Sequence, residues 1–273
     1  MKKVLILGAS GLIGRAIIEE FARDYDIYGT YNQSSIALPL DKQFQLKVDQ
    51  QVELEHILQR VQPDIVISSL RGEFQQQQKF HQHLVSLLRL TDARLYFLST
   101  TNVFDGDDSK LHTEKDTPIP FSEYGKFKVQ CESIIQYELQ DRGIIIRLPQ
   151  VWGTRSPRFN QIKEQISKKE AIPAYRNLIR TSLLDVTLAK QLRFIIEKEL
   201  LGVFHLTTYD AITDENFIIE LLHKLKQKEI PVQQEYYKDA ENTYYFGLQS
   251  IRTEIPKHLQ QTNADIMGSL VQR

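Results

Sequence analysis

The sequence lacks several features that mark specialised classes of protein. Its 273 residues include a single cysteine, Cys131, which cannot form an internal disulfide and so favours a reducing cytoplasm. The formal net charge of −1 at pH 7 is too small to attract nucleic acid or an anionic membrane surface. No apolar run approaches the ~20 residues of a membrane span, and the N-terminus is typical of a strand rather than a signal peptide. We therefore expect a cytoplasmic protein with no nucleic-acid partner and no membrane partner.

Metal-ligand patterns are lacking as well. Of the seven histidines, His81 and His83 are two positions apart and would point away from each other on a helix. Cys131 falls inside a segment of helical pattern, where we expect a buried, inert thiol rather than a nucleophile. The sequence therefore predicts no metal site.

Glycines are few, 12 in all, but three of them stand close together in the opening MKKVLILGASGLIG. Gly8 lets the chain leave a strand in a sharp turn, Gly11 lets a phosphate approach the backbone, and Gly14 lets a helix pack against the strand. The N-terminus of that helix would face the pyrophosphate of a dinucleotide. The alternative is a strand–helix turn that merely tolerates glycine. The position between a buried strand and an amphipathic helix favours a dinucleotide site.

The first half of the chain alternates between short apolar runs and helical patterns. We expect buried strands at 4–7, 27–31, 44–48, 65–69, 95–99 and 144–148, with helices between them at 12–23, 51–61, 74–91 and 123–141. Such alternation predicts an α/β fold with a doubly wound parallel sheet of the Rossmann type.

Beyond residue 149 the pattern becomes mainly helical. Helices are expected near 158–169, 185–199, 213–228 and 256–271, joined by strand-like pieces at 203–206 and 232–236. We interpret residues 1–149 as an NAD(P)-binding Rossmann domain and 150–273 as a smaller C-terminal α/β substrate lobe, interleaved with the first. The two would form a cleft over the carboxyl ends of the strands.

Two further motifs stand where carbonyl chemistry would need them. Hydroxyl side chains end the fifth expected strand, with Thr100 among them, and a later helix sets Tyr124 and Lys128 four positions apart. A tyrosine is a poor acid near neutral pH unless a cation lowers its pKa of about 10, and a lysine one turn away supplies that cation. An exposed helical pair is the alternative for a lone YxxxK. The combination with strand-end hydroxyls and the glycine turn favours a reductase site.

Several segments together resemble the extended short-chain dehydrogenase/reductases, and within them the dTDP-4-dehydrorhamnose reductase branch. STTNVFDG at 99–106 is similar to that branch's STDYVFDG, and TEKDTPIPFSEYGKFKVQCE at 113–132 to its approach to YGxxKxxxE, with Glu132 at the final acid. VDQQVELEHILQRVQPDIVISS at 48–69, RLPQVWG at 147–153 and LLDVTLA at 183–189 follow further family segments in the same order.

The resemblance implies an NAD(P)-dependent reductase of a nucleotide-linked 4-keto sugar. It implies that Thr100, Tyr124 and Lys128 are catalytic and that Tyr124 and Lys128 also hold the cofactor. The other implied cofactor residues are Gly8, Ser10, Gly11, Leu12, Ile13, Gly14, Arg15, Tyr31, Asn32, Val48, Asp49, Ser68, Ser69 and Leu70. The expected substrate residues are Arg71, Thr101, Asn102 and Gln150.

Some positions depart from the family pattern. The family's INAAA segment is ISSLRG here, which adds Arg71, and its asparagine before the fifth strand is replaced by His81 or a glutamine. Gln150 stands where the branch usually has a tryptophan that lines the sugar pocket. Trp152 stands at a tyrosine position and is expected to pack. The loss of the tryptophan predicts a more polar sugar than the deoxy sugar of the branch.

The end of the second strand decides between the two nicotinamide dinucleotides. An acid there accepts from the ribose 2′-hydroxyl of NAD and repels a 2′-phosphate. The segment YGTYNQSS at 28–35 holds no acid but offers Thr30, Asn32 and Ser34, and Arg15 follows Gly14. We therefore expect NADP(H) to be preferred, with NAD(H) as the alternative.

Two alternative functions remain open from the sequence. An epimerase or dehydratase of the same fold would need an extra acid or base where Thr101 and Asn102 stand. A non-catalytic, NADP-binding regulatory subunit is also known within this branch, although Tyr124 and Lys128 favour catalysis. The resemblance also allows a homodimer.

Overall fold

The central feature of the protein is a seven-stranded sheet in the order β11-β6-β5-β4-β1-β2-β3. The computed structural model describes residues 1–272. Every neighbouring pair of strands in this sheet is parallel, which confirms the doubly wound Rossmann arrangement. The strands are β1 (Lys3–Leu7), β2 (Asp26–Tyr31), β3 (Gln43–Gln45), β4 (Ile65–Ser68), β5 (Arg94–Leu98), β6 (Gly143–Arg147) and β11 (Val203–His205).

Helices cover both faces of this sheet, which is why its strands are apolar on both sides. One face packs against α1 (Leu12–Phe21) and α6 (Asp185–Glu197), and the other against α2 (Gln51–Val61), α3 (Phe74–Leu88) and α4 (Glu123–Leu139). Alternate residues of one strand enter opposite cores: in β1, Ile6 packs on the α1 side and Leu5 on the other side.

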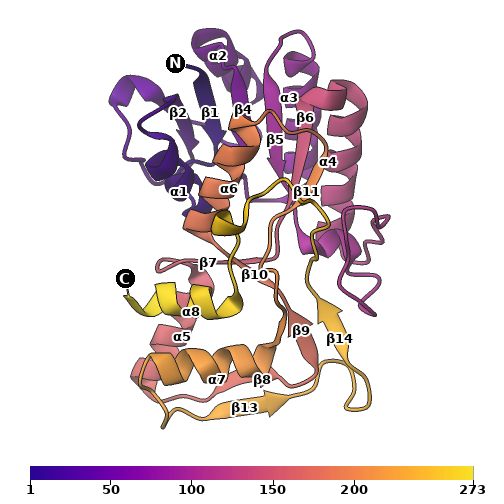
Figure 1. The fold of residues 1–273 in the computed structure, drawn as a ribbon. Helices are drawn as coiled ribbons and strands as arrows, with labels where there is room; N and C mark the ends of the chain where they lie inside the picture. The colour runs from indigo at the N-terminus through magenta and orange to yellow at the C-terminus, as the bar shows by residue number, and fades with distance from the viewer. Residues whose placement is uncertain (273) are drawn as a thin grey trace.

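Residues 185–205 return from the C-terminal half to the large sheet. Helix α6 lies against α1, and β11 pairs in parallel with β6, where Phe204 is fully buried. The large sheet therefore takes its elements from both sides of residue 149, as Figure 1 shows.

The smaller lobe lies at the carboxyl ends of the large sheet's strands (Figure 1). Its helices are α5 (Pro157–Lys168), α7 (Asp214–Lys224) and α8 (Asn263–Gln272). Its strand pairs are β7 (Gln150–Trp152) with β10 (Ser182–Leu184), β8 (Ile172–Tyr175) with β13 (Val232–Glu235), and β9 (Leu178–Arg180) with both β12 (Ile212–Thr213) and β14 (Tyr244–Phe246). Trp152 is buried in this lobe and stacks on Phe217 with ring centroids 4.7 Å apart, so it packs as expected.

Several expected elements differ in extent: the helices expected at 12–23, 74–91 and 213–228 end at Phe21, Leu88 and Lys224. The strand expected at 44–48 ends at Gln45. The helix expected from 256 begins only at Asn263, after Pro256 and a 3-10 turn at Lys257–Leu259. The Thr262 hydroxyl accepts from the Asp265 backbone N–H, and the Asp265 carboxylate accepts from the Thr262 N–H. This reciprocal cap fixes the start of α8.

Among residues 1–272, no helix combines the length and the apolar character that crossing a membrane requires.

Candidate active site

The turn after β1 is shaped by two of its three glycines. Gly8 has φ +85°, and a Cβ added at Gly14 would lie 2.6 Å from the Gly8 carbonyl oxygen. A Cβ added at Gly11 would meet only that same oxygen, at 3.4 Å, among the described residues. Packing therefore requires glycine at 8 and 14. At 11 the missing side chain instead keeps the surface open to a ligand.

Helix α1 begins at this turn with an open N-terminus. Gly11 is its N-cap, and no side chain of the described residues hydrogen-bonds to its first turn. Free backbone N–H groups and the positive end of the helix dipole suit a phosphate at this place.

A cavity of about 650 Å³ runs along this turn and the ends of β1, β2 and β4. Every expected cofactor residue lines it except Ser68, Tyr124 and Lys128. Lys47 and Arg155 also line it, and the sequence reasoning missed both. Arg155 follows β7 in the smaller lobe, so only the tertiary fold brings it to the groove.

Ser68 lies beneath the groove rather than on it. Its buried hydroxyl is 2.8 Å from His81 Nε2, while His81 Nδ1 is 2.7 Å from the Gln77 carbonyl oxygen. Because a carbonyl can only accept, Nδ1 carries the proton and Nε2 accepts from Ser68. Burial lowers the pKa of His81 to about 3, so the ring is neutral. His81 is therefore a hydrogen-bonded core residue, and its ring packs against Phe97.

Near the expected adenosine end, side chains hold the turn together. The Thr30 hydroxyl accepts from the Gly8 N–H at 3.1 Å, and Arg15 Nε donates to the Ser10 carbonyl at 2.9 Å. No acid follows β2 in the segment 32–35. Arg15 and Asn32 remain on the cavity wall beside Lys47.

A second cavity, of about 710 Å³, shares Ile13, Ser69 and Arg71 with the first. Thr100, Tyr124 and Lys128 all line it. Thr100 ends the segment after β5 and caps the 3-10 helix η2 (Thr101–Phe104), since its hydroxyl accepts from the Asn102 N–H. The structure thus brings the three expected catalytic side chains to one wall.

The glycine in Tyr124-Gly125-Lys126 explains how α4 comes so close to η2. A Cβ at Gly125 would lie 2.2 Å from the Asn102 carbonyl oxygen. Ser122 caps the helix by accepting from the Gly125 N–H at 3.0 Å. Tyr124 is thereby held close enough to interact with the Thr100 hydroxyl.

The electrostatics of Tyr124 differ from the expectation. Burial raises its pKa above the ordinary value, although the Thr100 hydroxyl and the charge of Arg71 oppose that rise. The expectation that Lys128 lowers the pKa of Tyr124 is therefore wrong, because burial raises this pKa and the cation that opposes the rise is Arg71. The phenol therefore stays protonated near neutral pH, which suits a proton donor.

Lys128 is almost completely buried beneath the same wall. Its ammonium donates to the Leu98 carbonyl at 2.9 Å and lies 4.4 Å from the centre of the Phe97 ring. Burial lowers its pKa to about 8. Two ammonium protons remain for other acceptors, because Leu98 takes one.

A buried ion pair supports the strand end that carries Thr100. Arg147 on β6 donates to Glu132 on α4, with Nη2 to Oε2 at 2.7 Å, and Glu132 also accepts from the Ser99 hydroxyl. Glu132 stands at the acid of the family motif. Arg147 Nη1 continues to His205 Nε2 at 3.4 Å, a partner that no sequence signal indicated.

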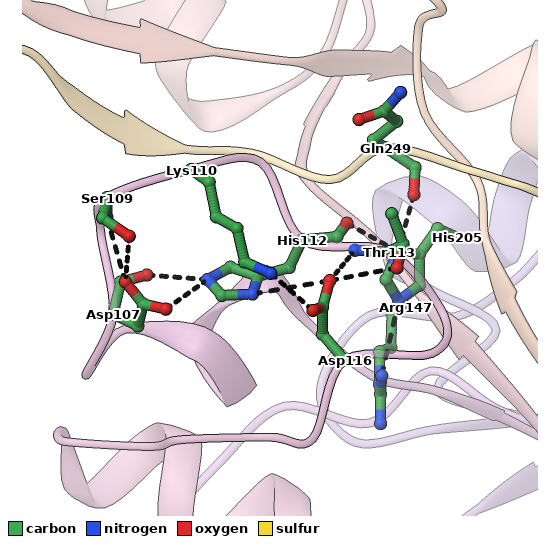
Figure 2. A network of polar contacts seen from close by, with 9 residues as sticks. All are labelled: Asp107, Ser109, Lys110, His112, Thr113, Asp116, Arg147, His205 and Gln249. Atoms are coloured by element: carbon green, nitrogen blue, oxygen red, sulfur yellow. Dashed lines mark hydrogen bonds and ion pairs between the residues drawn. The ribbon is translucent and has the colours of Figure 1, made fainter.

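This ion pair continues into the network of Figure 2. His205 Nδ1 is 3.1 Å from the His112 carbonyl and 3.2 Å from that of Gln249, so it donates and Nε2 accepts from Arg147. Burial lowers the pKa of His205 to about 4, which keeps the ring neutral. The network ties the loop between β5 and α4 to the segment that follows β14 (Figure 2).

The four expected substrate residues also line the second cavity. Thr101 donates its hydroxyl to the Leu148 carbonyl at 3.1 Å, and the Asn102 amide donates to Asp105 at 3.2 Å. The Gln150 amide oxygen accepts from Arg180 Nη1 at 3.3 Å. The smaller lobe adds residues that the sequence reasoning missed: Arg158, Tyr175, Arg180, Asp214, Glu235 and Phe246.

Taken together, one wall offers a phenol as proton donor, a buried cation and a strand-end hydroxyl, beside a groove with an open helix N-terminus. This set suits proton transfer to a carbonyl next to a dinucleotide. Within residues 1–272, no group of three or more His, Cys, Asp or Glu side chains could hold a metal ion.

The family described as RmlD substrate binding domain matches residues 71–254 of the chain. The probable low-salt glycan biosynthesis reductase Agl14 of Haloferax volcanii is 26% identical over 125 residues, which cover 44% of this chain and 41% of that protein. The chain thus spans less than half the length of this relative. Methionine adenosyltransferase 2 subunit beta of Rattus norvegicus is 27% identical over 235 residues, covering 78% of this chain and 69% of that one. A dTDP-4-keto-6-deoxy-D-glucose reductase of Streptomyces niveus is 22% identical, covering 75% and 72%.

Solved structures share the fold over the whole chain. A dTDP-4-dehydrorhamnose reductase from Bacillus anthracis, in complex with NADP, has a TM-score of 0.80 at 20% identity, covering 100% of this chain and 97% of that one. The Bordetella bronchiseptica enzyme WbmH, in complex with NAD⁺, has a TM-score of 0.83 at 16% identity, covering 99% and 96%. At these identities the likeness shows the fold.

Proposed function

This chain belongs to the RmlD substrate binding domain family, and from that membership we propose that it is an NAD(P)H-dependent reductase of a nucleotide-linked keto sugar. The observation that carries the proposal is the shared wall of Thr100, Tyr124 and Lys128, which opens onto the groove at the glycine turn. The similarity to a sugar-nucleotide reductase of Streptomyces niveus supports the substrate class.

The groove fits a dinucleotide on two grounds. Gly11 leaves open the space that a Cβ would fill, and the N-terminus of α1 has no side-chain cap within the described residues. The turn from Gly8 to Gly14 would hold the pyrophosphate. When bound, the dihydronicotinamide supplies the hydride for carbonyl reduction.

The protein's own side chains would handle the proton. Tyr124, whose raised pKa keeps it protonated, donates to the carbonyl oxygen as negative charge develops there. The Thr100 hydroxyl, which donates to Asn102 Oδ1 at 3.1 Å in this structure, would turn to that oxygen and orient it by a second hydrogen bond. Lys128 donates one proton to the Leu98 carbonyl and would hold the ribose hydroxyls of a bound cofactor with the others.

We propose NADPH as the preferred donor. The segment after β2 offers Asn32 and no acid, and Arg15, Lys47 and Arg155 line the same groove as possible partners of a 2′-phosphate. Fluorescence titration should show tighter binding of NADPH than of NADH, and Asn32→Asp should reverse that order. Equal affinities in the wild type would contradict this preference.

A reductase is favoured over an epimerase or dehydratase of the same fold. At the positions after Thr100, Thr101 and Asn102 carry no titratable group, and their side chains are engaged by Leu148 and Asp105. Neither of these two positions therefore supplies the additional acid or base. We also propose a cytoplasmic location, because Cys131, the single cysteine, is a buried free thiol.

A second candidate function is a regulatory subunit without turnover. The similarity to methionine adenosyltransferase 2 subunit beta, over 78% of this chain, favours it. Such a role would predict NADPH binding and a stable complex with a second protein, with no oxidation of NADPH by any keto sugar nucleotide.

The deciding experiment follows NADPH oxidation with a panel of nucleotide-linked keto sugars. Tyr124→Phe should lower turnover by ~10²–10⁴-fold and leave NADPH binding intact, because only a positioned acid is lost. Tyr137→Phe on the same helix is the matched control, since that side chain is 81% exposed. Absence of turnover with every substrate, or a Tyr124→Phe variant as active as the control, would refute the reductase assignment.

A further inference from the structure

A third cavity, of about 580 Å³, lies at the amino ends of β4 and β5. The catalytic wall stands at the carboxyl ends of the strands, and among the described residues this cavity shares no lining residue with either cavity of the candidate active site. Its volume is in the usual range of small-molecule pockets. The proposed function makes no use of it.

Tyr96 on β5 lines this cavity and has no polar partner. Its side chain is fully buried, and its hydroxyl makes no hydrogen bond with any described residue. We propose that this hydroxyl and the apolar walls around it bind a small, neutral, mainly apolar molecule that carries one hydrogen-bonding oxygen. The inference is independent of the proposed function.

The Tyr96 hydroxyl needs a partner because a buried polar group without one costs free energy and is rare in folded proteins. Arg94 lies two positions earlier on the same face of β5, but its Nη2 pairs with Glu199 Oε2 at 3.5 Å. Burial raises the pKa of Tyr96 to about 12, an effect that the nearby Arg94 guanidinium opposes, so the hydroxyl keeps its proton. It can therefore donate one hydrogen bond and accept another, and a ligand oxygen would supply the missing partner.

The walls around Tyr96 are apolar and come from both faces of the sheet. Ile65 and Ile196 belong to the core under α1 and α6, whereas Leu58 and Leu88 belong to the core under α2 and α3. An apolar ligand body between these side chains would be removed from water on binding. A mainly apolar surface with one fixed polar group is the usual composition of a small-molecule site.

The charges that line the cavity disfavour an ionised ligand. Its two cations, Lys2 and Arg94, already pair with one carboxylate, Glu199, at 3.2 and 3.5 Å. Three further carboxylates line the cavity: Glu55, Asp64 and Asp92. Acidic side chains therefore outnumber basic ones in the lining, which disfavours an anion. A cation would have to lose its hydration against the apolar walls in order to reach Tyr96.

Four probes that share a benzyl group test the class of ligand in NMR titrations of the whole protein. Benzyl alcohol is neutral and carries one oxygen, toluene has no polar group, phenylacetate is an anion and benzylammonium is a cation. Shifts of the backbone amide resonances at the amino ends of β4 and β5 locate the binding at this cavity rather than at the catalytic one.

Two variants with matched controls test the residues. Tyr96→Phe removes only the hydroxyl, and Tyr28→Phe on β2 is its control, because the Tyr28 hydroxyl donates to Asp26 and does not line the cavity. Leu58→Glu places a charge on the apolar wall near the end of α2. Val52→Glu on the same helix is its control, since that side chain is 65% exposed and lies outside the cavity.

We expect benzyl alcohol to bind most tightly of the four probes. Tyr96→Phe should weaken its binding by about 3–10-fold, the scale of one hydrogen bond, and leave that of toluene unchanged. Leu58→Glu should weaken the binding of both neutral probes, while the two controls bind as the wild type does. Because the hydroxyl lacks a partner in the free protein, Tyr96→Phe should also melt no lower than the wild type.

Several results would overturn the proposal. They are tightest binding of phenylacetate or benzylammonium, wild-type affinity for benzyl alcohol in Tyr96→Phe, and no amide shifts at this cavity with any probe. A lower melting temperature of Tyr96→Phe would overturn it as well, because the hydroxyl would then already have a partner in the free protein. None of these measurements depends on NADPH oxidation, so failure of the reductase assignment would leave this site standing.

Discussion

The buried ion pair between Glu132 and Arg147 offers the sharpest test of how the site is supported. The two side chains are 3% and 5% exposed, and Glu132 accepts from Arg147 Nε and Nη2 and from the Ser99 hydroxyl. Glu132→Gln keeps the shape but replaces one acceptor oxygen with an amide that donates. Donors would then face donors, and the charge of Arg147 would be left buried without a counter-ion.

The expected cost follows from that burial. Removing one partner of a buried ion pair costs about 3–5 kcal/mol of unfolding free energy. With about 2–4 °C per kcal/mol for a chain of this size, the melting temperature should fall by roughly 6–20 °C. Glu123→Gln on the same helix breaks the pair with Lys126. Because the Glu123 side chain is 81% exposed, this change should cost only about 0–1 kcal/mol.

Urea unfolding of the two variants and the wild type measures the difference, and NADPH oxidation below the melting range measures the function. We expect kcat to fall in Glu132→Gln because Ser99 precedes Thr100 and loses its anchor. A loss of stability no larger than that of Glu123→Gln would refute the electrostatic reasoning. Wild-type kcat in a destabilised Glu132→Gln variant would refute the link to Thr100.

Further predictions concern buried titratable groups and the contact between α4 and η2. Because burial lowers the folded-state pKa of Lys128 from 10.5 to about 8, the unfolded chain binds more protons between these values. The unfolding free energy of the wild type, relative to that of Lys128→Met, should therefore rise from pH 8 to 10.5 and stay level below pH 7. A difference in melting temperature between the two proteins that stays constant with pH would contradict this. His81, with a pKa of about 3 against 6.5, should make the protein less stable as pH falls from 6.5, and His81→Gln should flatten part of that slope in urea titrations. Gly125→Ala should cost about 1–3 kcal/mol and lower kcat, because its Cβ would lie 2.2 Å from the Asn102 carbonyl. Gly268→Ala, where a Cβ meets nothing within 4 Å, should instead leave activity unchanged and add about 0.5–1 kcal/mol of stability.

Local sequence pattern was enough to predict most strands of the large sheet and the glycine turn that follows β1. Apolar runs such as Val4–Leu7 are buried on both faces, and that property is visible in the residues themselves. The glycine turn followed from spacing, because φ and close packing at Gly8 and Gly14 are local requirements. Likewise, Tyr124 and Lys128 lie four residues apart on one helix, so both side chains reach the cavity wall that Thr100 also lines.

Contacts between residues far apart in the chain required the tertiary structure. The pairing of β11 with β6, the position of Arg155 in the cofactor groove and the link from His205 to Arg147 join segments with no common local pattern. The protonation of Tyr124 also depends on the tertiary structure, since burial by the surrounding residues raises its pKa. The sequence by itself determined the strands and helices of the first half, because periodicity and turn chemistry are short-range, but it did not indicate the short strands of the smaller lobe, such as β7 to β10. Only the fold decided which side chains share a cavity, as it does for Gln150, whose amide oxygen accepts from Arg180.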